Sequence, residues 1–299
     1  MNAGPFRISS ASALVRDGPA ALGEQRCRNL QHWAASTFRT RLVAIGLFAV
    51  GTCIALADGV SAAEIPLSER RSSYELMSPE LKAMQDEDTS NPGMLWVLEG
   101  EALWNRKTGE AHRACADCHG IVQQSMAGVA ARYPAFDAGR GMPVNLEGRI
   151  NVCRSEQQKA PALAFESKEL LSITALIAQQ SRGMPIESKD GRLDPFIEIG
   201  REMFNRRQGQ LDLACAQCHD DNSGRKLAGI PMPQAHPTGY PAYRLEWQTL
   251  GSLQRRLRNC MSGMRAETYS YGSPEYVALE TFLMWRARGM TMESPGVRP

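Results

Sequence analysis

The sequence has little net charge, no apolar run long enough for a comfortable membrane span, and no clear strand pattern. Its 34 lysines and arginines nearly balance 32 aspartates and glutamates, and the net charge of +2 does not favour nucleic acid or a strongly acidic partner. The apolar run at residues 42–57 falls short of the roughly 20 residues of a membrane-spanning helix. No segment alternates convincingly between apolar and polar residues, as a half-buried strand does. We therefore expect a mostly helical protein that binds no nucleic acid and is not an integral membrane protein.

The run at 42–57 instead has the form of a secretory signal. Positive charge precedes it and small residues follow it, which is the order of regions in a cleaved signal peptide. We expect cleavage near Ala62 or Ala63, so that residues 1–63 comprise an N-terminal extension and a signal peptide. An uncleaved anchor is the alternative. Export of this kind indicates the bacterial periplasm.

Cysteine is the most informative residue type that is present. The pattern C-x-x-C-H occurs twice, 100 residues apart: Cys115, Cys118 and His119, then Cys215, Cys218 and His219. In a c-type heme site the two thiols form thioethers with the porphyrin, and the histidine becomes an iron ligand. A bare C-x-x-C also suits zinc or a redox dithiol, but the adjacent histidine and the repetition favour heme. The sequence thus predicts two covalently bound heme c groups.

The repeat extends well beyond the heme motif, and we interpret it as a duplicated domain. Three further pairs of segments match in the same order: 100–106 with 200–206, 133–136 with 240–243, and 167–184 with 273–290. Only two copies are present, so a solenoid is not implied. We expect two tandem, mostly α, cytochrome c-like domains over residues 64–187 and 188–299. An N-terminal extension at 64–92 and a linker at 186–191 complete the predicted organisation.

Helical spacing supports this division. Ile197, Gly200 and Phe204 follow three- and four-residue steps before the second heme motif, as expected for the first helix of a cytochrome. Apolar residues at helical spacing also predict a closing helix in each copy: Leu170, Ile173, Leu176 and Ile177 in the first, and Val277, Phe282 and Trp285 in the second. Glycine and proline are frequent after each heme motif, which is typical of loops around a porphyrin.

One further cysteine accompanies each heme motif at an equivalent position of the repeat, Cys153 and Cys260. Three interpretations are open: a disulfide, two buried and inert thiols, or a sixth ligand for each iron, since thiolate is an established axial ligand. Methionine is the rival ligand because it is usual in cytochromes c. The methionine candidates are Met142, Met232, Met264 and Met290. His236 could also ligate iron, although we expect this histidine in an exposed loop.

The residues around Cys260 favour a helix. The apolar residues at three- and four-residue steps are Leu250, Leu253, Leu257, Met261 and Met264. Arg256 then lies one turn before Cys260 on the same face, where its guanidinium would favour a thiolate and could hold an oxyanion. Arg149 precedes Cys153 by the same interval, so the spacing does not distinguish the two copies.

These features resemble the SoxA family, the diheme subunits of the bacterial sulfur-oxidation cytochrome complex. The similarity rests on the two heme motifs, on Cys153, and on the segment Arg256-Leu-Arg-Asn-Cys260-Met, with 229–233 and 239–243 as supporting context. It covers essentially the whole mature chain, and the second half is its more specific part.

The resemblance implies that His119 and Cys153 ligate the first iron and that His219 and Cys260 ligate the second. It also implies that Cys260 acts as a cysteine persulfide in catalysis, with Arg256 contacting the anionic substrate. The implied enzyme is an L-cysteine S-thiosulfotransferase, which oxidatively conjugates thiosulfate to a cysteine of SoxY in the SoxYZ carrier complex. The implied partner is SoxX, a small monoheme cytochrome c that forms a heterodimer with the diheme subunit.

Other functions fit the heme motifs alone. A diheme electron carrier without thiosulfotransferase activity needs only histidine and methionine ligands and would tolerate the loss of Cys260 and Arg256. A heme-based sensor would keep an open or exchangeable sixth position. The thiosulfate-conjugating enzyme is the function we expect, because it gives the additional cysteine and Arg256 a role.

Overall fold

The computed structural model describes residues 64–187 and 189–299, so the predicted signal peptide and its cleavage site lie outside the described residues. Helices dominate the fold, as predicted, and the strands are only two or three residues long. The α-helices are α1 (Pro79–Asp86), α2 (Met94–Asn105), α3 (Ala116–His119), α4 (Val122–Ser125), α5 (Leu146–Cys153), α6 (Lys168–Gln179), α7 (Asp194–Asn205), α8 (Cys215–His219), α9 (Leu253–Gly263) and α10 (Pro274–Arg286). The strands are β1 (Ala135–Asp137), β2 (Met142–Val144), β3 (Lys226–Leu227), β4 (Ile230–Pro231), β5 (Ala242–Arg244), β6 (Thr249–Gly251) and β7 (Gly296–Arg298). Short helical turns are η1 (Leu67–Glu69), η2 (Ser73–Leu76), η3 (Ala130–Arg132), η4 (Arg154–Gln158) and η5 (Gly191–Leu193).

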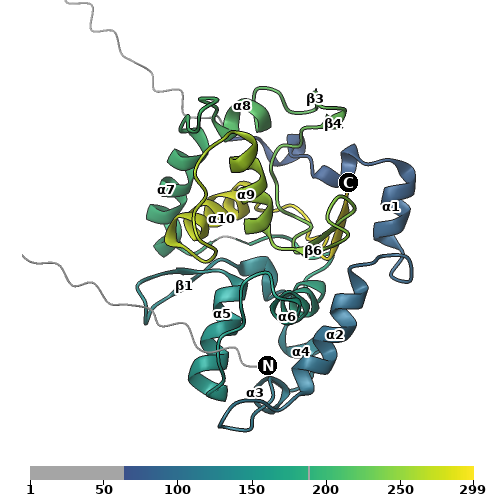
Figure 1. Cartoon of the computed structure of the whole chain (residues 1–299), viewed down its shortest axis with the longest axis vertical. Coiled ribbons are helices and arrows are strands. Elements are labelled where there is room, and N and C mark those ends of the chain that lie inside the picture. The colour runs from purple at the N-terminus through teal and green to yellow at the C-terminus, as the bar shows by residue number, and fades with distance from the viewer. Residues whose placement is uncertain (1–63, 188) are drawn as a thin grey trace, which may run out of the picture. The chain divides into compact units, whose positions relative to one another are not determined.

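Each repeat contains the same series of elements (Figure 1). A long helix (α2 or α7) leads to the short helix that carries the heme motif (α3 or α8). A two-stranded hairpin follows (β1–β2 or β5–β6), then the helix that ends near the additional cysteine (α5 or α9), and a closing helix (α6 or α10). Both predicted closing helices and the helix before the second heme motif are therefore present. The duplication seen in the sequence is a duplication of structure.

The strands explain why no alternating pattern was evident in the sequence. β1 pairs with β2 antiparallel, and β5 pairs antiparallel with β6 and parallel with β7 at the C-terminus. Two or three residues are too few to give a recognisable period of two. Leu250 lies in β6, so its assignment to the helix around Cys260 was wrong. That helix, α9, begins at Leu253, where the Ser252 side chain accepts a hydrogen bond from the backbone N–H of Arg255 at 3.2 Å.

A glycine lets two helices cross closely in each repeat. α2 packs on α6, and α7 packs on α10. A Cβ on Gly100 would lie 2.3 Å from the Ser172 carbonyl oxygen, and a Cβ on Gly200 would lie 2.3 Å from the Ala278 carbonyl oxygen. The matching glycines of the sequence repeat are thus contact points between helices, where any larger residue would push the two backbones apart.

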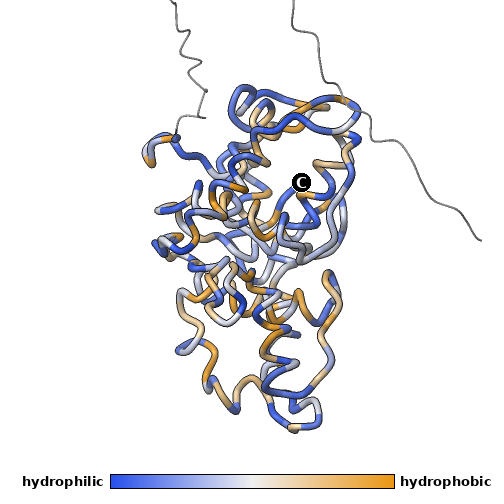
Figure 2. Tube along the Cα trace, turned by 90° about the vertical axis from the view of Figure 1, so that its left-hand side faces the viewer, coloured by the Kyte–Doolittle hydropathy of each residue, from blue (hydrophilic) through white to orange (hydrophobic). Residues whose placement is uncertain are grey.

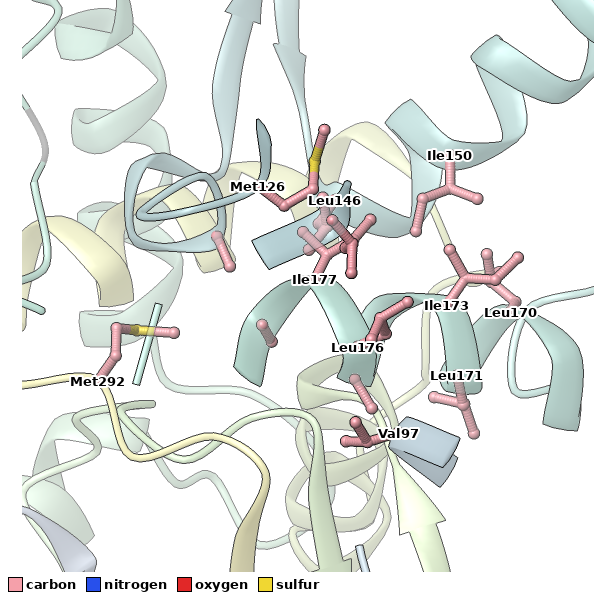
Figure 3. Packing of buried hydrophobic residues seen from close by; sticks show 14 of the residues in the cluster. Val97, Met126, Leu146, Ile150, Leu170, Leu171, Ile173, Leu176, Ile177 and Met292 are labelled. Carbon is pink, nitrogen blue, oxygen red and sulfur yellow. The ribbon is translucent and has the colours of Figure 1, made fainter. Parts of the chain in front are cut away.

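The hydrophobic core joins the two repeats. Its main cluster centres on α6, whose Leu170 and Leu176 are fully buried. Figure 3 shows Met126 and Leu146 next to Ile177 of this helix, and Met292 to one side of them; Met292, from the end of the second repeat, belongs to the same cluster. Leu250 and Ala287 of the second repeat belong to this cluster. A smaller cluster of the second repeat comprises Leu193, Ile197, Met203, Phe204, Leu279, Phe282 and Leu283.

The N-terminal segment 64–92 contacts the second repeat. The Asn91 amide donates to the Pro295 carbonyl at 3.0 Å, and the Gln85 side chain accepts from the Val297 backbone N–H at 3.0 Å. α1 accordingly lies beside the C-terminus of the chain (Figure 1). At the predicted linker, the Ile186 backbone N–H donates to the Met290 carbonyl at 2.8 Å. The segment 64–92 and the predicted linker are therefore both hydrogen-bonded to residues near the end of the second repeat.

Hydrophobic and hydrophilic residues alternate in short stretches along the trace (Figure 2). Within residues 64–187 and 189–299, no helix has the length and apolar character needed to cross a membrane.

Candidate active site

The first heme motif opens onto a cavity of about 510 Å³, a size usual for cofactor sites. Cys115, Cys118 and His119 line it from α3 and the preceding loop, and Cys153 lines it from the end of α5. The Trp104 ring packs 5.7 Å from the His119 imidazole, measured between ring centroids. Two thiols, an imidazole and a further thiol on an apolar cavity form a donor set that fits heme c.

The second heme motif contributes His219, but neither of its cysteines, to the lining of a smaller cavity of about 130 Å³. His219 and Cys260 both line it and lie within hydrogen-bonding reach of each other. The Nδ1 atom of His219 is 2.6 Å from the Pro233 carbonyl oxygen. A ring nitrogen held in this way fixes the tautomer and leaves Nε2 for a metal. His219 and Cys260 therefore fit a pair of iron ligands, and Cys215 and Cys218 lie on the same short helix as His219, α8.

A disulfide between Cys153 and Cys260, and the methionine ligands, find no support in this arrangement. Both thiols are free, and they line different cavities, so the disulfide interpretation was wrong. Among the described residues, neither cavity is lined by any of the four candidate methionines, Met142, Met232, Met264 and Met290. His236 is only 4% exposed, so the expectation of an exposed loop was also wrong. Its ring lines the Cys260 cavity, and burial lowers its pKa to about 4.

The second repeat has a hairpin that the first lacks. The stretch from His219 to Tyr240 is seven residues longer than the matching stretch from His119 to Tyr133. It contains β3 and β4, which pair antiparallel. Residues 230–233 of this hairpin and the turn after it contribute Ile230, Pro231 and Pro233 to the wall of the Cys260 cavity. The added segment thus supplies both the carbonyl that holds His219 and part of the cavity wall.

The two equivalent arginines have different electrostatic surroundings. Arg149 donates to the Asp137 carboxylate at 2.8 Å, so its charge is neutralised. Arg256 has Glu246 as its paired carboxylate at 4.0 Å, a much looser contact. The repeat position of Asp137 is occupied by Arg244 in the second copy, so an acid has been replaced by a base. The structure therefore separates two arginines that the sequence spacing left equivalent.

The pKa values of the two additional thiols, Cys153 and Cys260, are shifted in opposite directions. Burial raises the pKa of both. For Cys153 burial dominates, and its pKa lies above the ordinary value. For Cys260 a hydrogen bond with His219 and the positive charges of Arg256 and Arg244 together outweigh burial, so its pKa lies below the ordinary value. The second cavity favours a thiolate, whereas the first favours a neutral thiol.

Sequence reasoning missed two basic residues of this site. Arg244 in β5 and Arg298 in β7 line the cavity together with Arg256 and Cys260. Arg298 donates to Glu293 at 2.6 Å and to the Ser73 hydroxyl at 2.6 Å. Aligning the repeats would have exposed the change from acid to base at Arg244. No spacing pattern connects Arg298 to the site, because only the parallel pairing of β7 with β5 brings it there.

A protein-family model for the SoxA/TsdA cytochrome c domain matches residues 99–186 and 199–292, so each repeat carries its own match. The chain is 37% identical over 231 residues to the L-cysteine S-thiosulfotransferase subunit SoxA of Rhodovulum sulfidophilum, covering 77% of this chain and 80% of that protein. It is 34% identical over 216 residues to the SoxA subunit of Paracoccus pantotrophus, covering 72% and 74%.

The fold is also similar to a solved structure. The crystal structure of SoxXA from P. pantotrophus superposes with a TM-score of 0.74 at 32% sequence identity, covering 77% of this chain and 87% of that one. The sequence matches and the shared fold agree with the two heme motifs and the additional cysteines. The chain therefore belongs to the SoxA family of c-type cytochromes.

Proposed function

We propose that this chain is the periplasmic diheme subunit of an L-cysteine S-thiosulfotransferase, which conjugates thiosulfate oxidatively to a cysteine of SoxY. The observation that carries the proposal is the cavity in which Cys260 faces His219 and which gathers Arg244, Arg256 and Arg298. The names of the SoxA relatives support the activity. SoxX is the proposed partner, supported by the SoxXA complex from P. pantotrophus.

We propose two hemes, divided between residues 64–187 and 188–299. Cys115 and Cys118 would form the thioethers of the first, and Cys215 and Cys218 those of the second. His119 and Cys153 would ligate the first iron, and His219 and Cys260 the second. Bound heme c would supply one-electron acceptors for the reaction. The first domain would support electron transfer, and the second would carry the chemistry.

The basic residues of the second cavity suit a dianionic substrate. Thiosulfate carries two negative charges, and three guanidinium groups lower the free energy of bringing it beside the Cys260 sulfur. Arg256 is the residue proposed to contact the anion, because its own carboxylate partner is 4.0 Å away. Arg244 and Arg298 have closer partners, at 3.1 Å and 2.6 Å, and would contribute mainly through their charge.

The reaction balances with Cys260 as a sulfur carrier. A bond forms between the Cys260 sulfur, as thiolate, and the outer sulfur of thiosulfate, and two electrons leave. The SoxY thiolate then attacks the sulfur bound to Cys260, which forms the conjugate and returns Cys260 as a thiolate. The net change converts one SoxY thiol and one thiosulfate into the conjugate, one proton and two electrons. The same exchange balances when Cys260 carries an extra sulfur as a persulfide.

Electron paramagnetic resonance of the oxidised protein tests the ligands. Histidine–thiolate and histidine–methionine low-spin hemes differ in their g-values, and we expect the histidine–thiolate pattern at both sites. A histidine–methionine pattern at both hemes would overturn the ligand assignment.

Paired cysteine variants test the catalytic role. Cys260→Ala is expected to lose SoxY-dependent thiosulfate oxidation. Cys153→Ala, the matched variant in the other repeat, is expected to lose less, because it removes a proposed ligand of the first iron but leaves the thiol that carries sulfur. Full activity in Cys260→Ala would indicate a diheme electron carrier instead.

A further inference from the structure

A third cavity, of about 70 Å³, borders both the cavity of the first heme motif and the Cys260 cavity. It shares Tyr133 and Leu146 with the first and Tyr240 and Leu253 with the second. These residues occupy equivalent positions of the repeat, and the cavity therefore lies where the two repeats meet. It has part of its wall in common with each candidate site.

Two carboxyl groups line this cavity. Glu147 of α5 is 8% exposed and Glu280 of α10 is 5% exposed. The equivalent positions in the other repeat are occupied by Gln254 and Thr174, which are neutral. Neither acid therefore has an acidic counterpart in the other repeat. A carboxylate in such a position is costly unless it is paired or protonated.

The groups that face the two acids offer no positive charge. Among the described residues, the charged neighbour that acts on Glu147 is Glu166, and those that act on Glu280 are Glu147 and Glu166, all of them carboxyls. Glu166 itself has Arg255 at 4.0 Å. The remaining titratable groups on the cavity are the phenols Tyr133 and Tyr240, and burial raises the pKa of both. The charge of the pair must therefore be balanced by protons rather than by a basic residue.

The amides of Asn145 and Gln254 lie near the Glu280 carboxyl and act on it as hydrogen-bond donors, which opposes the effect of burial on its pKa. By ordinary hydrogen-bond geometry, however, Oε2 of Glu280, Nδ2 of Asn145 and Nε2 of Gln254 have no partner among the described residues. The three residues are 5%, 4% and 1% exposed, respectively. Buried polar atoms of this kind are normally satisfied by ordered water or a proton. A cavity of about 70 Å³ has room for several water molecules.

Burial and mutual repulsion set the protonation of the pair. Burial raises the pKa of Glu147 to about 7, and burial together with the neighbouring charge of Glu147 raises the pKa of Glu280 well above its ordinary value. Near neutral pH the pair therefore holds a proton that two exposed carboxyls would have lost.

We propose that Glu147 and Glu280 form a proton-binding site between the two hemes, which gains a proton when the protein gains an electron and releases it when the electron leaves. One electron adds one negative charge, and one proton bound by a carboxylate removes it. Charge in a low-dielectric interior is thereby kept nearly constant. The inference rests on the two hemes of the proposed function, whose reaction releases two electrons and one proton.

Potentiometric titration of the heme-loaded full chain tests this site. The absorption of the protein is followed with chemical reductants and no thiosulfate, between about pH 5 and pH 9, on either side of the pKa of the pair. We expect the reduction potential of at least one heme to fall as pH rises, with an upper limit of about 59 mV per pH unit for one proton per electron. Because no substrate is present, a failure here is distinct from a failure of the proposed thiosulfotransferase activity.

Isosteric variants assign the effect. Glu147→Gln combined with Glu280→Gln should make the potentials nearly independent of pH, and Glu147→Gln alone should reduce the slope. Glu275→Gln, at an exposed acid on the same helix α10, should keep the slope of the unmodified protein. The proposal is overturned if the reduction potentials of the unmodified protein do not depend on pH. It is also overturned if Glu147→Gln keeps the full slope, and this single variant decides the question if the double variant does not fold.

Discussion

At the scale of single residues, one exchange of charge separates the two repeats. Asp137 neutralises Arg149 beside the first cavity, whereas Arg244 stands at the equivalent position beside the second. Three arginines line each cavity, so the exchange does not change their number. It leaves Arg256, beside Cys260, without the close carboxylate that Arg149 has beside Cys153.

Removing the guanidinium at each equivalent position should therefore have unequal effects. We expect Arg256→Ala to lower kcat/KM for thiosulfate by about tenfold to a hundredfold, since a hydrogen bond to a charged group contributes about 1.5–3 kcal/mol. Arg149→Ala, the matched control, should stay close to the unmodified enzyme. Steady-state kinetics with SoxY checks both, and equal losses in the two variants would contradict the assignment.

Placing the acid of the first repeat at the equivalent position of the second should give Arg256 a close carboxylate partner, as Arg149 has. Arg244→Asp is expected to raise KM for thiosulfate by at least about tenfold, because the new carboxylate would compete with the substrate for Arg256. Arg244→Gln, which removes charge without adding an acid, should give a smaller increase. Heme absorption spectra report whether either variant is folded, and an unchanged KM in a folded Arg244→Asp enzyme would count against the anion site.

At the scale of elements, the crossing of two helices positions each heme motif. α7 reaches the second motif while packed on α10, and Gly200 is the point of closest approach. The hairpin of the second repeat and the turn after it then add what the first repeat lacks, a carbonyl on His219 and an apolar wall beside Cys260. The common elements therefore build a heme site, and the added segment adapts one of them.

A methyl group at the crossing should be costly. Gly200→Ala would place Cβ 2.3 Å from the Ala278 carbonyl oxygen, and overpacking of this kind costs about 1–3 kcal/mol. Gly263→Ala is the control, since a Cβ there meets nothing within 4 Å. We expect a lower free energy of unfolding in chemical denaturation for Gly200→Ala and little change for Gly263→Ala. Equal stabilities would show that α7 and α10 can separate without cost.

At the scale of the whole molecule, the two repeats are not independent. Residues of the second repeat complete the main core around α6, and the segment 64–92 is hydrogen-bonded to the C-terminal residues. The buried acids Glu147 and Glu280 lie where the repeats meet. Stability of this junction should therefore depend on pH.

The direction of that dependence follows from the raised pKa. In the folded protein the pKa of Glu147 is about 7, above its ordinary value of 4.5, so folding favours the protonated acid. The contribution is fully present below about pH 4.5 and is lost as pH rises through about 7. Denaturant titrations of the oxidised protein should show a loss on the order of 3 kcal/mol over this interval. Glu147→Gln should flatten the curve, and a curve that is unchanged in this variant would place the titrating group elsewhere.

The sequence by itself determined the heme chemistry, the duplication and the helical class, because these depend on local spacing: C-x-x-C-H, matching segments, and apolar residues every three or four positions. It also placed Arg256 one turn before Cys260 on a helix. Only the tertiary structure decided which of the two equivalent arginines is held by a close carboxylate. Arg298 reaches the Cys260 cavity through the pairing of β7 with β5, and Glu147 meets Glu280 through the packing of the two repeats. Such contacts join residues more than 50 positions apart, and no local period records them. They arise because burial of one shared core brings distant segments together.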